Sequence, residues 1–210
     1  MDGPDFSLED GARGEGFATI AGIDETGRGP GAGPGGAAAV LLDRATMTDE
    51  LLVGLNDSKK LSAKKRETLF AALPECARIG VGLASVDEID DTNILAATMT
   101  AMARALDDLG ASPDLALIDG NRVPKLACPA RCEVKGDGRS LSIAAASIIA
   151  KVTRDRIMAE LSIECPGYGW ERNAGYGTKA HREGLERLGV TPHHRKSFAP
   201  IHKILSRRLL

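Results

Sequence analysis

Aromatic residues and cysteines are scarce in this sequence. Aromatics make up 3% of the 210 residues, so a hydrophobic core has to be built mainly from Ala, Val, Ile and Leu. The four cysteines stand at 76, 128, 132 and 165, without the second Cys or His pair that zinc-finger spacing requires. We therefore expect reduced thiols in a cytoplasmic protein, and neither a zinc centre nor a disulfide framework.

Long apolar runs are also missing. No segment reaches the roughly 20 apolar residues that span a bilayer, so we expect no membrane partner. Residues 1–16 are acidic and rich in glycine, lack the apolar stretch of a secretory signal, and predict a disordered tail. Residues 17–210 have the length of a single domain, whose last part, about 166–210, is predicted to be a helical C-terminal region.

The net charge of −2 hides an uneven distribution along the chain. Residues 151–210 hold 12 Lys and Arg against 6 Asp and Glu, which leaves 15 against 23 for residues 1–150. An acidic part that attracts cations, joined to a basic part that attracts phosphates, is a layout that suits a nuclease. Basic C-terminal helices are also common as solvated surfaces, so the charge pattern alone decides nothing.

Hydrophobic patterning predicts an α/β domain with a central mixed sheet and an appended helical region. The first two strands are separated by a glycine-rich turn and are expected to form a hairpin. The expected strands span residues 17–24, 34–42, 77–86, 115–119 and 132–135, and the expected helices span 62–73, 93–109, 142–164, 178–188 and the chain from about 200.

Four acidic residues follow predicted strands. Asp24 and Glu25 end the first strand, Asp119 ends a later one, and Asp137 follows another, each close to a glycine. Because adjacent strand residues point to opposite faces, we expect the backbone to turn at Asp24 and Glu25, with Gly27 permitting the turn. Taken singly, each acid is explained as well by a solvated turn. Together they predict a Mg²⁺ site that hydrolyses phosphodiesters with water, since gathered carboxylates repel one another without cations.

Two glycine- or lysine-rich segments suggest ligands of different kinds. Residues 31–36 match the dinucleotide fingerprint G-x-G-x-x-G, but a strand follows where the fingerprint needs a helix, which argues against a nicotinamide enzyme. Lys59 and Lys60 precede a predicted helix, where lysines and free amides suit phosphates. An exposed basic turn explains these lysines equally well.

An aromatic loop in the basic part is a further candidate for nucleic-acid contact. Tyr176 stands between two glycines, where it can stack on a sugar or a base, and polar residues that suit phosphates follow it. Tyr176 and Phe198 are equally open to interpretation as core anchors. The polar residues of the loop are Thr178, Lys179 and His181.

Taken in order, these segments resemble the ribonuclease HII family, the bacterial type 2 ribonucleases H. The likeness covers roughly residues 20–200 and is carried by the series rather than by any one motif. The matching segments are DETGRGP at 24–30, LNDSKKLS at 55–62, IDGN at 118–121, KGD at 135–137, AAASIIAKVTRD at 144–155, GYGTK at 175–179 and HRKSF at 194–198.

The resemblance implies a ribonuclease H-like fold and an endonuclease that cuts the RNA strand of RNA–DNA hybrids and single ribonucleotides in duplex DNA. It implies that Asp24, Glu25, Asp119 and Asp137 coordinate two Mg²⁺ or Mn²⁺ ions. The implied junction-reading residues are Gly27, Arg28, Gly29 and Tyr176, and the further implied substrate contacts are Lys59, Lys60, Lys151, Thr178, Lys179, His181 and Arg195.

Three positions depart from the family pattern. Gly138 follows Asp137 where Ser or Ala is common, and Asn173 and Ala174 stand where His and Lys often precede the loop tyrosine. We expect a looser loop at Gly138 and weaker phosphate binding from Asn173 and Ala174, with the four acids unaffected. The related type 3 enzymes lack the Gly-Arg-Gly turn, which this chain has.

Two other functions are compatible with parts of the pattern. A non-catalytic nucleic-acid-binding protein would keep the basic part, although all four acids are present here. Another two-metal phosphodiesterase of the same fold would keep the acids, although the Gly-Arg-Gly turn and the Tyr176 loop argue against it. We expect a monomer. Ser206–Leu210 shows no aromatic pair typical of a sliding-clamp-binding motif.

Overall fold

The structure is a computed structural model that describes residues 3–207. Its contacts divide the chain into two compact units. The first unit, which we call the sheet unit, contains the chain up to Thr26 and the segments Gly36–Leu83 and Met99–Val152. The second, the helical unit, contains Gly27–Gly35, Ala84–Thr98 and the chain from Thr153 onward.

A five-stranded mixed sheet forms the centre of the sheet unit, in the order β3-β2-β1-β4-β5. β1 pairs antiparallel with β2, which confirms the predicted hairpin, and parallel with β4, which in turn pairs parallel with β5. The strands are β1 (Ile20–Thr26), β2 (Gly35–Leu42), β3 (Ala77–Ala84), β4 (Leu115–Asp119) and β5 (Ala130–Glu133).

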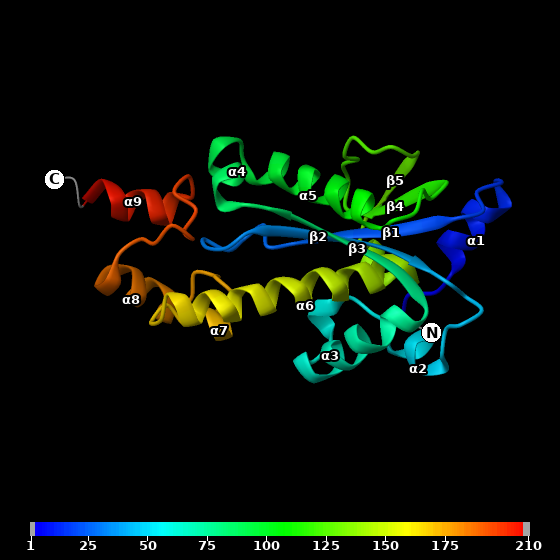
Figure 1. Ribbon diagram of the computed structural model, residues 1–210, viewed down its shortest axis with the longest axis horizontal. Coiled ribbons are helices and arrows are strands. Elements are labelled where there is room, and N and C mark those ends of the chain that lie inside the picture. The colour runs from blue at the N-terminus through cyan, green and yellow to red at the C-terminus, as the bar shows by residue number, and fades with distance from the viewer. Residues whose placement is uncertain (1–2, 208–210) are drawn as a thin grey trace. The chain divides into compact units, whose positions relative to one another are not determined.

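Helices cover both faces of this sheet, α5 (Ile94–Asp108) on one side and α6 (Leu141–Glu164) on the other (Figure 1). Glycines allow both helices to approach the strands closely. A Cβ atom on Gly22 of β1 would lie 2.2 Å from the backbone of Ser142, and one on Gly82 of β3 would lie 2.0 Å from the carbonyl oxygen of Ala101. Because Gly22 and Asp24 share a face of β1, the same face carries Asp24 toward α6.

Small aliphatic residues build the core between the sheet and α6, as the scarcity of aromatics predicts. Ala38 and Val40 of β2 pack against Ala145 and Ile148 of α6 in one buried cluster. Two further helices of this unit add leucines to the cluster, α2 (Asp49–Gly54) and α3 (Ala63–Ala72). α3 begins as predicted at Ser62, whose hydroxyl accepts a hydrogen bond from the amide of Lys65.

The N-terminal segment corrects the prediction of a disordered tail over residues 1–16. Residues 1 and 2 lie outside the described part, but Ser7–Gly14 forms the helix α1. Its Ala12 packs against Ile20, Leu115 and neighbouring residues. The buried carboxylate of Glu9 accepts hydrogen bonds from the Ser140 and Ser142 hydroxyls and from the Ser142 amide at the start of α6. The acidic, glycine-rich composition of residues 1–16 gives no indication of this interaction.

The helical unit has its own core around Trp170. Tyr168 stacks on Trp170 with ring centroids 5.0 Å apart, and Met158, Leu185 and Ile201 complete the buried cluster. Phe198 packs against the same cluster, which confirms its interpretation as a core anchor. The helices of this unit, besides the end of α6 and the start of α5, are α4 (Val86–Asp91), α7 (Trp170–Asn173), α8 (Lys179–Leu188) and α9 (Ala199–Arg207).

The predicted helices and strands are found close to their expected bounds, but several short helices were not predicted. α1, α2, α4 and α7 have four to eight residues each, which is shorter than the stretch over which a hydrophobic period identifies a helix. Three 3-10 turns were also unpredicted, η1 (Ser58–Lys60), η2 (Leu73–Glu75) and η3 (Gly136–Gly138). Among residues 3–207, no helix is long and apolar enough to cross a membrane, and all four cysteines are unpaired.

Candidate active site

Three of the predicted acids meet at one end of the sheet. Asp24 and Glu25 lie on β1, and Asp119 is the last residue of the parallel neighbour β4. The register Ile23↔Ile118 places Asp24 next to Asp119 one step further along. Oxygen atoms of the three carboxylates lie within 4.8 Å of one another, close enough to share a cation.

The backbone does not turn at Asp24 and Glu25, contrary to our expectation. β1 continues through both residues in regular register with β2, as far as the pair Thr26↔Gly36. The pairing of β1 with β4 ends at Ile23↔Ile118, so beyond this pair the edge of β1 is open. The longer side chain of Glu25 brings its carboxylate to the site while the strand stays regular, and the turn follows at Gly27, where φ is +82°.

Asp137 approaches the site from a 3-10 turn rather than from a strand end. It is 8% exposed and lies in η3, four residues beyond the end of β5. The turn is tied to Asp119, whose carboxylate accepts a hydrogen bond of 2.7 Å from the amide of Gly136. Asp137 is not part of the three-carboxylate group, but its charge interacts with that of Asp119.

The electrostatics of the site disfavour four ionised carboxylates. Burial, together with the nearby charges of Glu25 and Asp119, raises the pKa of Asp24 well above its ordinary value. Burial likewise raises the pKa of Asp119, and burial with the charges of Asp119 and Asp57 raises the pKa of Asp137 to about 6. Carboxylates that are costly to ionise in the absence of a counter-charge are the donors that a bound cation stabilises.

Several residues that support these acids were not predicted. Ser147 of α6 is buried, donates a hydrogen bond to Asp24, and is 2.8 Å from the hydroxyl of Ser58 in η1. Asp57 forms a hydrogen bond with Asp137. Both serines and Asp57 lie inside the family motifs quoted above, so the sequence contained a signal, although spacing alone assigned them no role.

The two lysines of η1 face different surroundings. Burial lowers the pKa of Lys59, but the charges of Asp24, Asp57 and Asp137 outweigh burial, so its pKa is raised. Lys59 therefore interacts with the acidic site itself. Lys60 is exposed, and its Nζ would lie 3.8 Å from a Cβ on Gly138. Lys151, on α6, is half-buried.

The helical unit brings the Gly-Arg-Gly turn and the tyrosine loop together. A Cβ on Gly29 would lie 3.3 Å from Cε1 of Tyr176, so the ring packs against the glycine backbone. Tyr176 is 45% exposed, which argues against a core anchor and leaves its ring accessible to a ligand. Arg28, which precedes Gly29 in the chain, is exposed.

Asn173 orders the tyrosine loop through its side-chain amide. Its amide nitrogen donates to the carbonyl oxygen of Tyr168 at 2.8 Å and to the hydroxyl of Thr178 at 3.2 Å. Its side-chain oxygen accepts from the amide of Gly175 at 2.9 Å. The asparagine removes a cation, as expected, but it orders the loop by three hydrogen bonds.

Arg195 and His181 are buried, which corrects their prediction as direct substrate contacts. Arg195 is 0% exposed and donates to the carbonyl oxygens of Gly33 and Pro34 at 2.9 and 3.1 Å. His181 is 1% exposed, and both of its ring nitrogens have partners inside the protein. Neither side chain has the exposure that binding a phosphate requires.

The remaining predicted contacts of this loop are at the surface or at a helix start. Thr178 is the N-cap of α8, where its hydroxyl accepts from the amide of His181. The side chain of Lys179 is 84% exposed and lies 3.7 Å from Glu183. Both positions are compatible with a nucleic-acid backbone contact.

Comparison with known proteins identifies the class of protein that has this fold and this acidic site. A solved structure titled ribonuclease H2 from Pyrococcus horikoshii OT3 aligns with a TM-score of 0.78 at 29% identity, covering 90% of this chain and 98% of that one. A structure titled Bst-RNase HIII in complex with Mn²⁺ has the same fold, with a TM-score of 0.74 at 21% identity over 93% of this chain and 72% of that one. The fold and its acidic site are those of a ribonuclease H-like, metal-dependent endonuclease.

The sequence narrows this class to one family. The family described as Ribonuclease HII matches residues 21–201. Ribonuclease HII of Ruegeria sp. (strain TM1040) is 57% identical over 206 residues, which is 98% of this chain and 88% of that protein. Ribonuclease HII of Rhodospirillum rubrum is 56% identical over 209 residues, covering 99% and 94% of the two chains. The chain belongs to the ribonuclease HII family.

Proposed function

We propose that this chain hydrolyses the RNA strand of RNA–DNA hybrids and cuts on the 5′ side of single ribonucleotides embedded in duplex DNA. The observation that carries the proposal is the group of Asp24, Glu25 and Asp119, whose carboxylate oxygens lie within 4.8 Å in a chain of this family. The cut leaves a 3′-hydroxyl and a 5′-phosphate. The cellular role that follows is the removal of ribonucleotides from DNA in the cytoplasm.

The acidic site fits two divalent ions, Mg²⁺ or Mn²⁺. Its donors are carboxylate oxygens, the ligands that these cations prefer. The raised pKa values of Asp24, Asp119 and Asp137 show that these side chains lack a sufficient counter-charge of their own. Asp24, Glu25, Asp119 and Asp137 would hold the ions. The chemistry that bound ions would supply is positive charge that stabilises the negative charge developing on a phosphodiester during hydrolysis.

The chain's own side chains fix where that charge is placed. Ser147 and the Glu25 amide both donate to the carboxylate of Asp24, which restricts its orientation. The Gly136 amide does the same for Asp119. This restraint on the carboxylates supports the rate of hydrolysis, because a small displacement of a catalytic group lowers the rate strongly. Lys59, whose charge is balanced by the acids, is suited to meet a substrate phosphate at the same place.

Selectivity for the ribonucleotide is assigned to the Gly27-Arg28-Gly29 turn and Tyr176. Carboxylates and ions cannot distinguish RNA from DNA, since the phosphates are identical and the 2′-hydroxyl is the group that differs. Glycines in the turn let main-chain groups approach the sugar. The exposed ring of Tyr176 can stack on the following sugar. Lys60, Lys151, Thr178 and Lys179 are proposed as contacts to the nucleic-acid backbone.

Partners other than nucleic acid are not required by this proposal, and we propose a monomer. A structure titled the PCNA:RNase HII complex from Archaeoglobus fulgidus aligns with a TM-score of 0.71 at 28% identity, over 86% of this chain and 95% of that one. The sequence prediction of no clamp-binding motif concerns Ser206–Leu210, and residues 208–210 lie outside the described part of the chain. We propose no clamp partner for this protein.

One experiment tests the proposed activity against its alternatives. The protein is incubated with a DNA duplex that carries one ribonucleotide, with Mg²⁺ or with EDTA, and the cut position is mapped. We expect a single cut 5′ of the ribonucleotide that EDTA abolishes. Binding without cleavage would favour a non-catalytic nucleic-acid-binding protein, and cleavage of all-DNA duplexes would favour another two-metal phosphodiesterase.

A further inference from the structure

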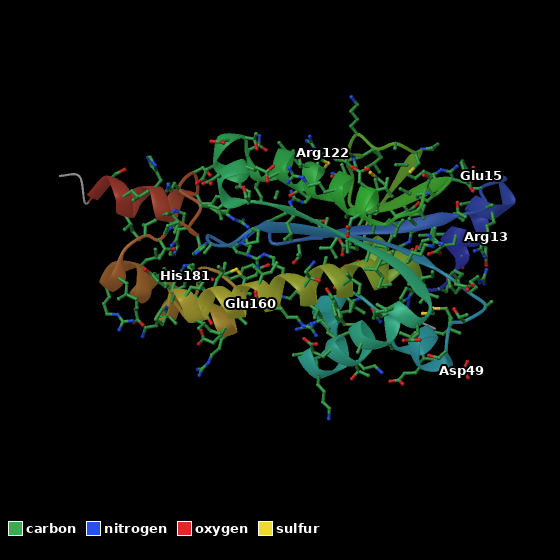
Figure 2. All side chains as sticks on the ribbon, viewed as in Figure 1. Arg13, Glu15, Asp49, Arg122, Glu160 and His181 are labelled. Atoms are coloured by element: carbon green, nitrogen blue, oxygen red, sulfur yellow. The ribbon has the colours of Figure 1, made fainter. Side chains whose placement is uncertain are left out.

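Two buried histidines of the helical unit are in direct contact. His181 lies in the first turn of α8 (Figure 2), and His194 lies in the segment after that helix. Their Nε2 atoms are 3.0 Å apart, and the side chains are 1% and 0% exposed. The contact is enclosed by the rings of Tyr168 and Trp170.

The partners of His181 define where its proton lies. Its Nδ1 is 3.0 Å from the carbonyl oxygen of Tyr176, which can only accept, so Nδ1 carries the hydrogen. The indole nitrogen of Trp170, which can only donate, is 3.2 Å from Nε2 of His181. Nε2 is therefore an acceptor, and the ring is neutral.

The partners of His194 define the complementary arrangement. The amide of Thr191, which can only donate, lies 3.0 Å from Nδ1 of His194, and the Thr191 hydroxyl, which accepts from the His193 amide, lies 2.8 Å from the same nitrogen, so Nδ1 is an acceptor. A neutral ring then carries its hydrogen on Nε2, which points at the acceptor Nε2 of His181. A second proton on His181 would face donors from His194 and Trp170, and one on His194 would face the Thr191 amide. Burial and the nearby His181 lower the pKa of His194 to about 3, in agreement with a neutral pair.

We propose that His181 is a positioning residue for the junction-reading loop, held by His194 in the tautomer that donates to the main chain of Tyr176. The chain of hydrogen bonds runs from Thr191 through His194 and His181 to the Tyr176 carbonyl, which also accepts from the Thr178 amide at 2.7 Å. Fixing this carbonyl fixes the peptide from which the exposed Tyr176 ring projects. The inference rests on the proposed function, because it assigns His181 an effect on ribonucleotide selectivity.

Two uncharged substitutions test the two ring nitrogens of His181 separately. The side-chain nitrogen of Asn occupies the place of Nδ1, so His181→Asn keeps a donor to Tyr176 and loses the acceptor for Trp170. The amide of Gln occupies the place of Nε2, so His181→Gln keeps that acceptor and loses the donor to Tyr176. A histidine that only fills the core predicts similar effects from both. His202→Gln, at an exposed position of α9, is the matched control.

The measurements are kcat/KM on a single-ribonucleotide duplex and on a long RNA–DNA hybrid, with melting temperatures to confirm folding. We expect His181→Gln to lose about tenfold on the single-ribonucleotide duplex, as befits one lost hydrogen bond and the loop shift it permits. The loss on the hybrid should be smaller, and His181→Asn should stay within about threefold of the wild type. Equal losses for the two variants, or equal losses on the two substrates, would overturn the proposal.

Tryptophan emission provides a readout that is independent of nuclease activity. Trp170 is the single tryptophan of the chain, and its indole N–H donates to His181. We expect the emission maximum to move in His181→Asn and to stay at the wild-type position in His181→Gln, the reverse of the activity pattern. Equal emission changes would refute the assigned tautomers. Failure of the wild type to cut its substrate, with the expected emission pattern intact, would instead count against the proposed function.

Discussion

The carboxylate of Asp119 accepts a hydrogen bond of 2.7 Å from the amide of Gly136, the residue immediately before Asp137. This contact joins the end of β4 to the 3-10 turn η3, two segments separated by 17 positions in the sequence. It places Asp137 close to Asp119, whose charge contributes to the raised pKa of Asp137, although Asp137 lies on neither strand. The position of the fourth acid therefore depends on the third.

Substitution of single acids should abolish turnover while leaving the fold intact. We expect Asp24→Asn, Glu25→Gln, Asp119→Asn and Asp137→Asn each to lower kcat by at least about 100-fold, because each removes a charged ligand for the ions. The measurement is single-turnover cleavage of the single-ribonucleotide duplex at saturating enzyme, with circular dichroism to confirm folding.

Asp155→Asn is the control for the fourth acid. Asp155 lies on α6, half-buried, and outside the acidic site as assigned. We expect its kcat to stay within about tenfold of the wild type. A variant at 155 as inactive as Asp119→Asn, with Asp137→Asn close to normal, would transfer the role of fourth acid from Asp137 to Asp155.

The raised pKa of Asp137 predicts a pH-dependent effect on the metal-free protein. The folded pKa is about 6 against an ordinary value of 3.8, so this carboxyl stabilises the fold most at low pH, and that contribution is lost as pH rises through 6. Asn resembles the protonated acid and avoids the loss. In EDTA, Asp137→Asn should therefore melt about 2–4 °C higher than the wild type at pH 7.5.

The same comparison of melting temperatures, made at pH 4 and with Mg²⁺, tests whether the charge of Asp137 causes the difference. The gain should vanish near pH 4, where Asp137 is protonated in both the folded and the unfolded chain. Addition of Mg²⁺ at pH 7.5 should raise the melting temperature of the wild type more than that of the variant. A gain in EDTA that persists unchanged at pH 4 would show that packing, rather than charge, is responsible.

Much of the fold could be predicted because the longer elements are apolar segments that end at recognisable turn or helix-ending residues. α6 and β4 were expected at 142–164 and 115–119 and are found at Leu141–Glu164 and Leu115–Asp119. α1 was not predictable in this way. It is held in place by the packing of Ala12 and by the buried carboxylate of Glu9, whose partners lie more than 130 positions away in the chain.

Three acids of the candidate site could be brought together from the sequence, but the geometry of the site could not. Asp24, Glu25 and Asp119 were expected at strand ends, and the parallel register of β1 and β4 brings them together, whereas Asp137 lies in a 3-10 turn. The Glu25 carboxylate reaches the site because the pairing of β1 with β4 stops before this residue, and sequence periodicity does not reveal where that pairing stops. The burial of Arg195 and His181 was not predicted either, because arginine is usually exposed and histidine is intermediate, and here both side chains donate to main-chain carbonyls.

Loss of the Glu9 carboxylate should destabilise the protein without a direct effect on the site. Glu9→Ala leaves the hydroxyls of Ser140 and Ser142 and the Ser142 amide without their acceptor, at a cost of about 2–3 kcal/mol. Asp10→Ala is the neighbouring control. Its side chain is 51% exposed and pairs with Arg13 and Arg44 at the surface, so its loss should cost under about 1 kcal/mol. Urea unfolding measures both, and equal costs would contradict a specific role for Glu9.

The exposed ring of Tyr176 should set selectivity for the ribonucleotide. Loss of the hydroxyl removes one hydrogen bond to the substrate, so Tyr176→Phe should lower kcat/KM on the single-ribonucleotide duplex about 2- to 10-fold. Loss of the ring removes stacking as well, so Tyr176→Ala should lower it about 10- to 100-fold. Both losses should be smaller on a long RNA–DNA hybrid, which offers further ribonucleotides to the site.

Tyr168→Phe separates this role from a general effect of removing a tyrosine hydroxyl. Tyr168 is buried, and its hydroxyl donates to the carbonyl oxygen of Gly189 at 2.8 Å, so its removal should lower the melting temperature and leave the ratio of the two activities unchanged. Tyr176 is 45% exposed, so Tyr176→Ala should change that ratio with little change in melting temperature. The reverse pattern, a large fall in melting temperature and equal small losses on both substrates for Tyr176→Ala, would mean that the ring serves the fold rather than the substrate.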